Sequence, residues 1–262
     1  MQDSSENSTD AGGNITPYDV VAGTHVGLVR DVNEDSYGYC VDDHHRNCFI
    51  AVADGIGGHD SGDIASKMCT RTLLIAWKKS LLWRGGTIEE MKNFLEIETA
   101  NSNEAIYRLN KTFNVQHPMG TTLIAAIITP DSVVTAHAGD SRCYRLRNGI
   151  LECLTEDHSF VAELIKRNII SREKSKNHPF AHIISKSIGT NLEFKSEVNV
   201  FDRKPSDRFL LCSDGVNVHL EDPQIEIIIH DASNPYEAVK NLIYASLRGG
   251  GEDNITAACV FA

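Results

Sequence analysis

The sequence lacks the features of an exported or membrane protein. The first 17 of its 262 residues contain no Lys or Arg and no apolar run, so they match neither a signal peptide nor an amphipathic targeting helix. Its longest apolar stretches, such as residues 123–128 and 225–229, are far shorter than the roughly 20 residues that cross a bilayer. We therefore expect a cytoplasmic protein without a membrane span.

Paired cysteines and an excess of positive charge are also lacking. The 7 cysteines are odd in number, form no Cys-x-x-Cys pair and lie mostly in apolar runs, which favours buried reduced thiols over a zinc site or a disulfide framework. The formal net charge of -11 opposes binding to nucleic acid or to an anionic membrane through like-charge repulsion. The same surplus of carboxylates is compatible with a cluster that binds cations.

The composition changes once, near the N-terminus. Residues 1–16 are rich in Ser, Asn, Asp and Gly without periodicity, and they can bury too little apolar surface to offset the cost of ordering. We predict a disordered polar tail there. The rest of the chain is long and apolar enough for one large domain or two small ones, and we expect a single domain over residues 17–262.

Short runs rich in Val, Ile, Cys and Phe predict most of the strands. They cover residues 20–23, 37–41, 49–53, 122–129, 133–138, 143–147, 209–212 and 255–261. Pro130-Asp131 separates two of these runs, and Asn148-Gly149 is the dipeptide that two-residue hairpins prefer. These turns indicate antiparallel pairing.

Three segments have helical signals. Apolar residues recur at spacings of three and four over residues 62–83. A second helix begins at Thr87, whose spacing to Glu90 is that of a capping box, and extends towards residue 109. A third begins at Asn234-Pro235 and ends at the glycines of 249–251. The whole pattern predicts an α+β fold in which helices cover antiparallel sheets.

One arrangement occurs four times: an aspartate beside a small residue at the end of an apolar strand. A single such residue is ordinarily a turn former, but four strand ends on one edge of a sheet can converge. Carboxylates crowded in this way are tolerated when they share hard divalent cations. Gly55 would also let a backbone carbonyl approach a metal. The four residues are Asp54, Asp140, Asp214 and Asp253.

A fifth polar segment, residues 30–35, reads Arg-Asp-Val-Asn-Glu-Asp. Alone it would be a solvated charged loop. Beside the aspartates, Arg30 suggests a phosphate clamp, because a guanidinium group matches phosphate oxygens bidentately.

These five segments, in this order, resemble the type-2C metal-dependent protein phosphatases, particularly the bacterial members. The resemblance covers nearly all of residues 19–262 and includes Gly-Thr-Thr at 120–122, Thr-Glu-Asp-His-Ser at 155–159, and His-Pro at 178–179 followed by Ser-Ile-Gly at 187–189. It implies a four-layer α-β-β-α sandwich, two antiparallel sheets flanked by antiparallel helices. It also implies a flap at about residues 158–190.

The resemblance implies a role for each candidate residue. Asp54 matches an aspartate that bridges two cations, and the carbonyl of Gly55 completes the site of the first. Asp214 and Asp253 complete the site of the second, and Asp140 with Asp214 holds a third, weaker ion. Glu34 resembles an acid that acts through water on the metal, and Arg30 resembles the phosphate clamp.

The implied activity is hydrolysis of phosphoserine and phosphothreonine in proteins. Two tightly bound Mn²⁺ or Mg²⁺ ions and a weaker third would activate a bridging water for direct attack on phosphorus. No cysteine is followed by an arginine six residues on in a glycine-rich loop, so a cysteinyl-phosphate route is not indicated. The expected partners are substrates of a Ser/Thr kinase, and the expected state is a monomer.

The chain departs from the family pattern at a few positions. Ile56 stands where some members have a histidine proposed as general acid, so protonation of the leaving group is expected from water on the metal. In the flap, His182 and Lys186 replace the usual Asn and Arg. His59 is given a supporting role, since oxygen ligands suffice for hard ions.

Two other functions are compatible with a similar fold. A phosphatase-like module that binds a partner without catalysis would be expected to lack the bridging or the terminal aspartate, and both Asp54 and Asp253 are present. A two-metal phosphodiesterase acting on nucleotides would require base-recognition and basic surface features, which the sequence does not offer.

Overall fold

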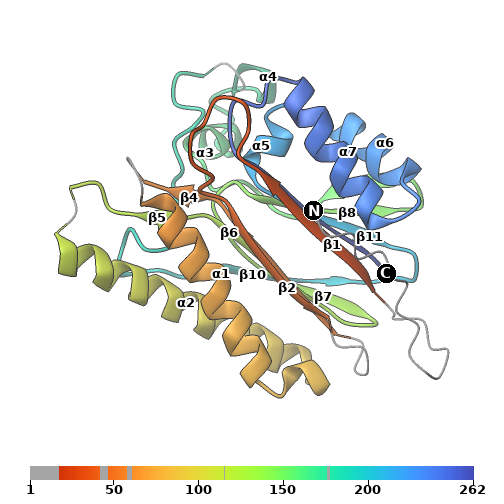
Figure 1. The fold of residues 1–262 in the computed structure, drawn as a ribbon, viewed down its shortest axis with the longest axis horizontal. Coiled ribbons are helices and arrows are strands. Elements are labelled where there is room, and N and C mark those ends of the chain that lie inside the picture. Colours follow the sequence, from red (N-terminus) through yellow and green to blue (C-terminus); the bar gives the residue numbers. More distant parts are fainter. Residues whose placement is uncertain (1–17, 42–46, 58–60, 115, 176–177) are drawn as a thin grey trace.

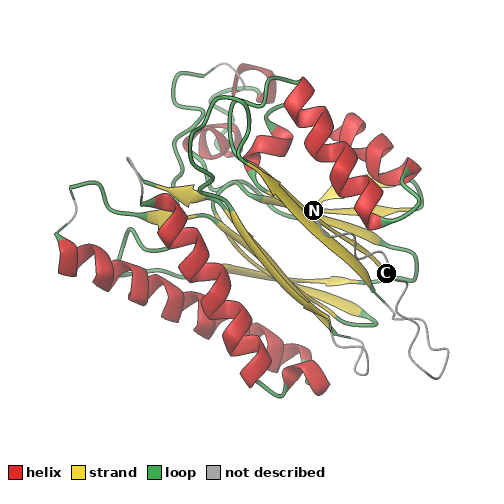
Figure 2. Ribbon diagram, in the orientation of Figure 1, coloured by secondary structure: helices red, strands yellow, loops and turns green. Residues whose placement is uncertain are grey.

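The computed structural model describes residues 18–41, 47–57, 61–114, 116–175 and 178–262 (Figure 1). The predicted disordered tail, residues 1–16, lies outside the described residues. Two five-stranded antiparallel sheets face each other, and helices cover the outer face of each sheet (Figure 2). The fold is therefore the α+β fold that the sequence pattern predicts, with the four layers that the resemblance implies.

The first sheet holds both ends of the described chain. Helix α7 packs against its strands β1 and β12, and α6 packs beside α7. Its strand order is β1 (Asp19–His25), β12 (Ile255–Phe261), β11 (Arg208–Cys212), β8 (Arg142–Arg147) and β9 (Ile150–Cys153). The helices on this side are α5 (Asp214–Asn217), α6 (Asp222–Asp231) and α7 (Pro235–Arg248).

The second sheet is covered by two long helices, α1 (Gly62–Lys79) and α2 (Ile88–Phe113) (Figure 1). Its strand order is β10 (Glu197–Asp202), β7 (Ser132–Ala138), β6 (Leu123–Ile128), β3 (Cys48–Ala53) and β2 (Ser36–Val41). A short pair, β4 (Gly55–Ile56) with β5 (Gly120–Thr121), continues beyond β3 and before β6.

Strand β3 shows why these strands are continuously apolar. Phe49 and Ala51 face the α1 and α2 side, whereas Ile50 and Val52 face the other sheet. Because both faces of the strand are buried, the alternation of polar and apolar residues that marks a surface strand is absent. The two layers of core side chains fix the strand ends, and with them the residues that follow.

The predicted helix over residues 62–83 is shorter than expected. Helix α1 ends at Lys79, and Ser80 is extended (φ -68°, ψ 158°) before a 3-10 turn, η1 (Leu82–Arg84). The capping box of α2 is present as predicted, with Thr87 and Glu90 bonded reciprocally. Strand β10 and the short helices α3 (Phe160–Lys166) and α4 (Arg172–Ser175) were not predicted. In the described part of the chain, no helix has the length and apolar character needed to cross a membrane.

Candidate metal centre

The four aspartates singled out from the sequence lie at one end of the paired sheets. Asp54 follows β3 and Asp140 follows β7, whereas Asp214 opens α5 directly after β11 and its N-cap Ser213. Asp253 precedes β12, in which Ala257 pairs with Cys212 at the end of β11. We call these four residues the aspartate cluster: Asp54, Asp140, Asp214 and Asp253. All four are partly exposed, so solvent reaches the cluster.

The electrostatics show that the cluster has converged. Burial raises the pKa of Asp54 well above its usual value, and the charges of Asp35 and of the other three members of the cluster raise it further. Burial and the charge of Asp214 raise the pKa of Asp140 to about 7. For Asp214, burial and the charge of Asp253 raise the pKa to about 6, although a hydrogen bond with Asp54 acts in the opposite sense. Without a counter-charge the cluster is therefore electrostatically strained.

Asp54 is held by the Gly-Thr-Thr segment. Its amide donates to Thr122 Oγ1 (2.9 Å), and its carbonyl accepts from the Thr122 amide and from Thr121 Oγ1 (2.8 Å each). A Cβ on Gly55 would lie 2.3 Å from the carbonyl oxygen of Gly62 and 2.7 Å from that of Glu34. Only glycine therefore fits beside Asp54, as expected of a backbone in a crowded site.

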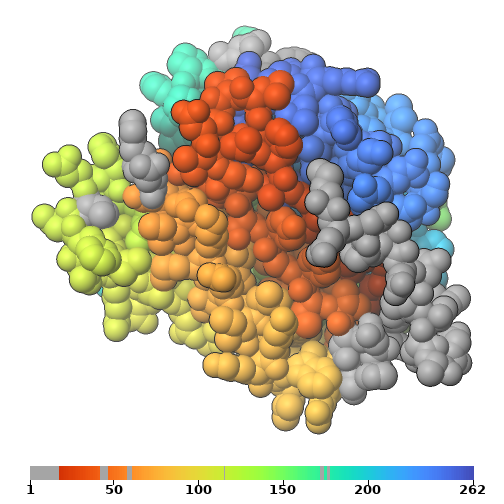
Figure 3. Space-filling view, in the orientation of Figure 1, coloured from red at the N-terminus to blue at the C-terminus, as the bar shows by residue number. Residues whose placement is uncertain are grey.

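Arg30 and Glu34 approach the cluster from the loop between β1 and β2. This loop lies at the surface between the C-terminal helices and the segment that follows β9 (Figure 3). Arg30 Nη2 donates to Asp253 Oδ2 at 2.7 Å. Glu34 Oε1 accepts from the Gly62 amide (3.2 Å), and burial raises the pKa of Glu34. The loop thus brings a guanidinium and a carboxyl group to the edge of the cluster.

Asp35 is a site residue that the sequence did not reveal, although it lies in the polar segment 30–35. The side chain is 4% exposed and accepts from Ser213 Oγ at 2.7 Å, and Ser213 Oγ accepts from the Thr256 amide. Burial raises the pKa of Asp35 to about 7. Asp35 joins β2 to the residue before Asp214, a contact 178 positions apart that no local pattern reveals.

The cluster fits divalent cations by its unsatisfied oxygens. Oδ1 of Asp140 and Oδ1 of Asp214 are buried and have no hydrogen-bond partner among the described residues. Over those same residues, no three His, Cys, Asp or Glu side chains already surround one point as ligands of a single ion. Ions such as Mg²⁺ typically take one or two carboxylates and complete their shell with carbonyls and water, so pairs of aspartates suffice.

The positions at which the chain departs from the family pattern lie outside the aspartate cluster or beyond the described residues. Ile56 lies in β4 and is partly buried. Lys186 lies near Glu197 and His158, and burial lowers its pKa, whereas His182 is exposed. His59 lies outside the described residues.

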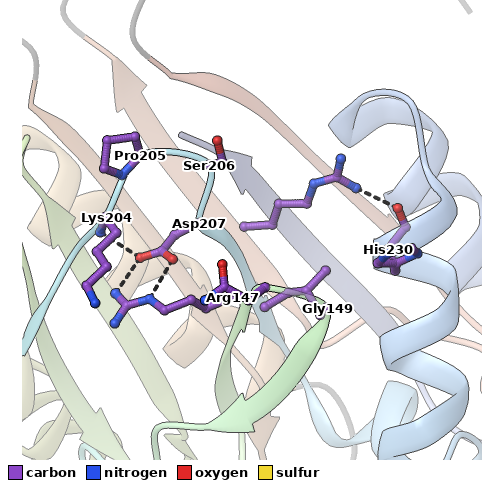
Figure 4. A pocket seen from close by; sticks show the side chains of 10 residues that line it. Arg147, Gly149, Lys204, Pro205, Ser206, Asp207 and His230 are labelled. Atoms are coloured by element: carbon purple, nitrogen blue, oxygen red, sulfur yellow. Dashed lines mark hydrogen bonds and ion pairs between the residues drawn. The ribbon is translucent and has the colours of Figure 1, made fainter.

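A separate cavity of about 500 Å³ lies at the opposite end of the first sheet (Figure 4). Three of its charged side chains, Arg147, Asp207 and Arg208, are already hydrogen-bonded within the protein. Arg147 binds Asp207 through two hydrogen bonds (2.8 and 2.7 Å), and Arg208 donates to three carbonyls at the end of α6. We assign no ligand to it.

Most of the chain matches the model of a protein family. Residues 23–247 match the model of the protein phosphatase 2C family. The chain is 37% identical over 237 residues to the serine/threonine phosphatase stp of Listeria monocytogenes serotype 4b, a similarity that covers 90% of this chain and 93% of that protein.

Solved structures show the same similarity in three dimensions. The serine/threonine phosphatase of S. agalactiae superposes with a TM-score of 0.87 at 30% identity, covering 94% of this chain and 99% of that one. The catalytic domain of the serine/threonine phosphatase PstP, solved in complex with two manganese ions, gives a TM-score of 0.81 at 31% identity, with 93% and 97% covered.

Proposed function

Because the chain belongs to the protein phosphatase 2C family, we propose that the aspartate cluster is its catalytic metal centre. The protein is a metal-dependent serine/threonine protein phosphatase, and its substrates are phosphoproteins. One observation supports the assignment of the centre above all: Asp54 has a raised pKa because it is buried and because Asp35 and the other three members of the cluster place negative charge around it. Such crowding is stable when cations neutralise it.

We assign three cation sites to residues of the cluster. Asp54 would help hold two tightly bound Mn²⁺ or Mg²⁺ ions, the first together with the carbonyl of Gly55 and the second together with Asp214 and Asp253. Asp140 and Asp214 would hold a third, weaker ion, an assignment supported by the unpartnered Oδ1 atom of each residue. The two manganese ions of the PstP domain support the choice of metal for the first two sites.

The chain's own residues bind and orient the phosphate. When bound, the cations supply a water of lowered pKa as the nucleophile and neutralise charge on the phosphoryl oxygens, so no side chain carries the phosphate. Arg30 binds two of those oxygens through its guanidinium group. Glu34 is anchored through Oε1 to the Gly62 amide, and its other oxygen would act on the metals through a bound water.

Three further properties stay predictions. They are a cytoplasmic location, a monomeric state and a Ser/Thr kinase that phosphorylates the same substrates. The net charge of -11 supports the absence of nucleic acid among the partners.

Hydrolysis of a phosphothreonine peptide tests the proposed centre. We expect turnover with Mn²⁺, none with excess chelator, and a loss of at least about a hundredfold in Asp54→Asn and Asp253→Asn at saturating Mn²⁺. Asp131→Asn, which changes an exposed carboxylate between β6 and β7, is the matched control and should hydrolyse at the wild-type rate. More than a tenth of the wild-type rate in Asp54→Asn would contradict the assignment.

A further inference from the structure

The turn that carries Asp140 is hydrogen-bonded to His158, a residue at the start of the flap. The Gly139 amide donates to His158 Nδ1 (3.2 Å), and the Gly139 carbonyl accepts from the His158 amide (2.7 Å). Gly139 has a φ of +111°, and a Cβ there would lie 2.6 Å from Thr122. Both backbone polar groups of Gly139, the residue before Asp140, are therefore satisfied by His158.

The neighbouring residue holds the other side of the same turn. Asp157 accepts two hydrogen bonds from Arg142, at 2.8 Å from Nε and 2.7 Å from Nη2. Such bidentate pairs fix direction as well as distance. Since Gly139 precedes Asp140 and Arg142 follows it by two residues, Asp157 and His158 hold the turn at both ends.

His158 is itself held firmly. Its Nε2 lies 3.1 Å from Glu197 Oε2, and its ring stacks on that of His137, with 4.6 Å between centroids and 21° between planes. Because Nδ1 accepts from Gly139, the ring proton is on Nε2 and is donated to Glu197. The His158 carbonyl accepts from the Ser185 amide (2.8 Å), which closes the base of the flap.

We propose that His158 is a positioning residue for Asp140. Its ring acceptor binds the Gly139 amide and its backbone amide binds the Gly139 carbonyl, and this fixes where the Asp140 carboxylate enters the aspartate cluster. The inference rests on the proposed role of Asp140 in holding the weak third ion. His158 would contact neither the metal nor the substrate, so its effect reaches the reaction through Asp140.

Two amide substitutions separate the two nitrogens of the ring. The amide oxygen of Asn lies near the position of Nδ1 and can accept from Gly139, whereas the amide of Gln reaches the position of Nε2. We expect His158→Gln to weaken the last Mn²⁺ to bind by about tenfold and to lower kcat by a similar factor with little change in KM, the effect of one lost hydrogen bond. We expect His158→Asn to stay within about threefold of wild type, as should the control Glu197→Gln, which leaves the Gly139 contact intact.

Calorimetric titration of chelator-treated protein with Mn²⁺ is the primary measurement, and Asp140→Asn is the reference variant. If His158 acts through Asp140, adding His158→Gln to Asp140→Asn should change neither Mn²⁺ binding nor kcat further. Independent, multiplying effects would overturn the proposal, and so would equal losses in His158→Asn and His158→Gln.

The same titration separates the two levels of inference. If Asp140→Asn leaves all Mn²⁺ binding unchanged, the role of Asp140 fails, and the positioning role fails with it. If Asp140→Asn loses the weak ion but His158→Gln keeps it, only the role of His158 fails. If a melt shows His158→Gln to be unfolded, Asp157→Asn tests the same turn from its other end. We expect the same weakened ion in that variant, and unchanged binding would overturn the proposal.

Discussion

The ion pair between Arg30 and Asp253 joins two residues that are both proposed to serve the reaction. Their side chains are 52% and 37% exposed, so the 2.7 Å contact is worth at most about 1 kcal/mol. A phosphoryl group offers Arg30 two oxygens in place of one. The guanidinium can therefore turn from Asp253 to the substrate at little cost, and this frees Asp253 for a cation.

We expect Arg30→Ala to raise KM for a phosphothreonine peptide by about tenfold to a hundredfold, the effect of losing a charge-assisted contact with the phosphate. Arg30→Lys should have a KM between those of wild type and Arg30→Ala, because an ammonium group keeps the charge but cannot make the bidentate contact of a guanidinium group. Steady-state kinetics at saturating Mn²⁺ measure both variants. If KM and kcat of Arg30→Ala both match wild type, Arg30 is an ordinary surface charge.

His137 gives the protein a pH-dependent stability. Its ring is 1% exposed, and neither nitrogen has a hydrogen-bond partner among the described residues, although the Ser141 backbone lies near. Burial and the neighbouring His158 lower its pKa from 6.5 to about 4, against the opposing charges of Asp157 and Glu197. The folded state therefore holds this ring neutral over a range in which the unfolded state binds a proton.

The sign of the effect follows from that difference. The stabilisation is complete above pH 6.5 and is lost as the pH falls towards 4, by up to about 3 kcal/mol. His137→Phe keeps an aromatic ring that does not titrate. The free energy of unfolding of wild type should therefore fall more steeply than that of His137→Phe as the pH is lowered. Urea unfolding at several pH values between 4.5 and 7.5 measures this, and a difference between the two free energies that does not change with pH would refute it.

At the scale of single elements, the N-terminus of α2 was predicted in detail. The Glu90 amide donates to Thr87 Oγ1 (3.2 Å) and the Thr87 amide donates to Glu90 Oε2 (2.8 Å), so both hydrogen bonds of the capping box are present. Thr87→Ala should lower the melting temperature by roughly 2–4 °C and leave kcat/KM unchanged, because α2 starts far from the aspartate cluster. Thr87→Ser, which keeps the hydroxyl, is the control. A matching loss of activity would mean that α2 supports the site.

The elements that the sequence predicts well are those whose signal is local. Strands such as β3 and β6 are buried on both faces and are continuously apolar, whereas the missed strand β10 is only partly buried. The strand-end aspartates were found for the same reason, since each motif lies within a few residues. The contacts of Asp157 with Arg142 and of His158 with Gly139 join residues 15 and 19 positions apart, so only the folded chain shows them.

At the scale of the whole molecule, the fold and the net charge oppose each other. Two packed sheets bring four strand-end carboxylates together in a chain whose formal charge is already -11. Repulsion within the cluster then lowers the stability of the metal-free protein at neutral pH, because the unfolded chain keeps these groups apart and ionised. Asp54→Asn removes the most strained of them. We therefore expect this variant, in chelator, to melt at a higher temperature than wild type.

Cations should relieve the same strain in wild type. A ligand that binds only the folded state stabilises it by about 2.7 kcal/mol at a hundredfold excess over Kd, so millimolar Mn²⁺ or Mg²⁺ should raise the melting temperature of chelator-treated protein by several degrees. Ca²⁺ is larger and tolerates looser geometry, so it should stabilise the fold yet support little hydrolysis. Asp54→Asn should respond less to every ion, since its bridging carboxylate is gone. If wild type melts at the same temperature with and without millimolar Mn²⁺, the aspartates form no metal site, and the proposed centre must lie elsewhere.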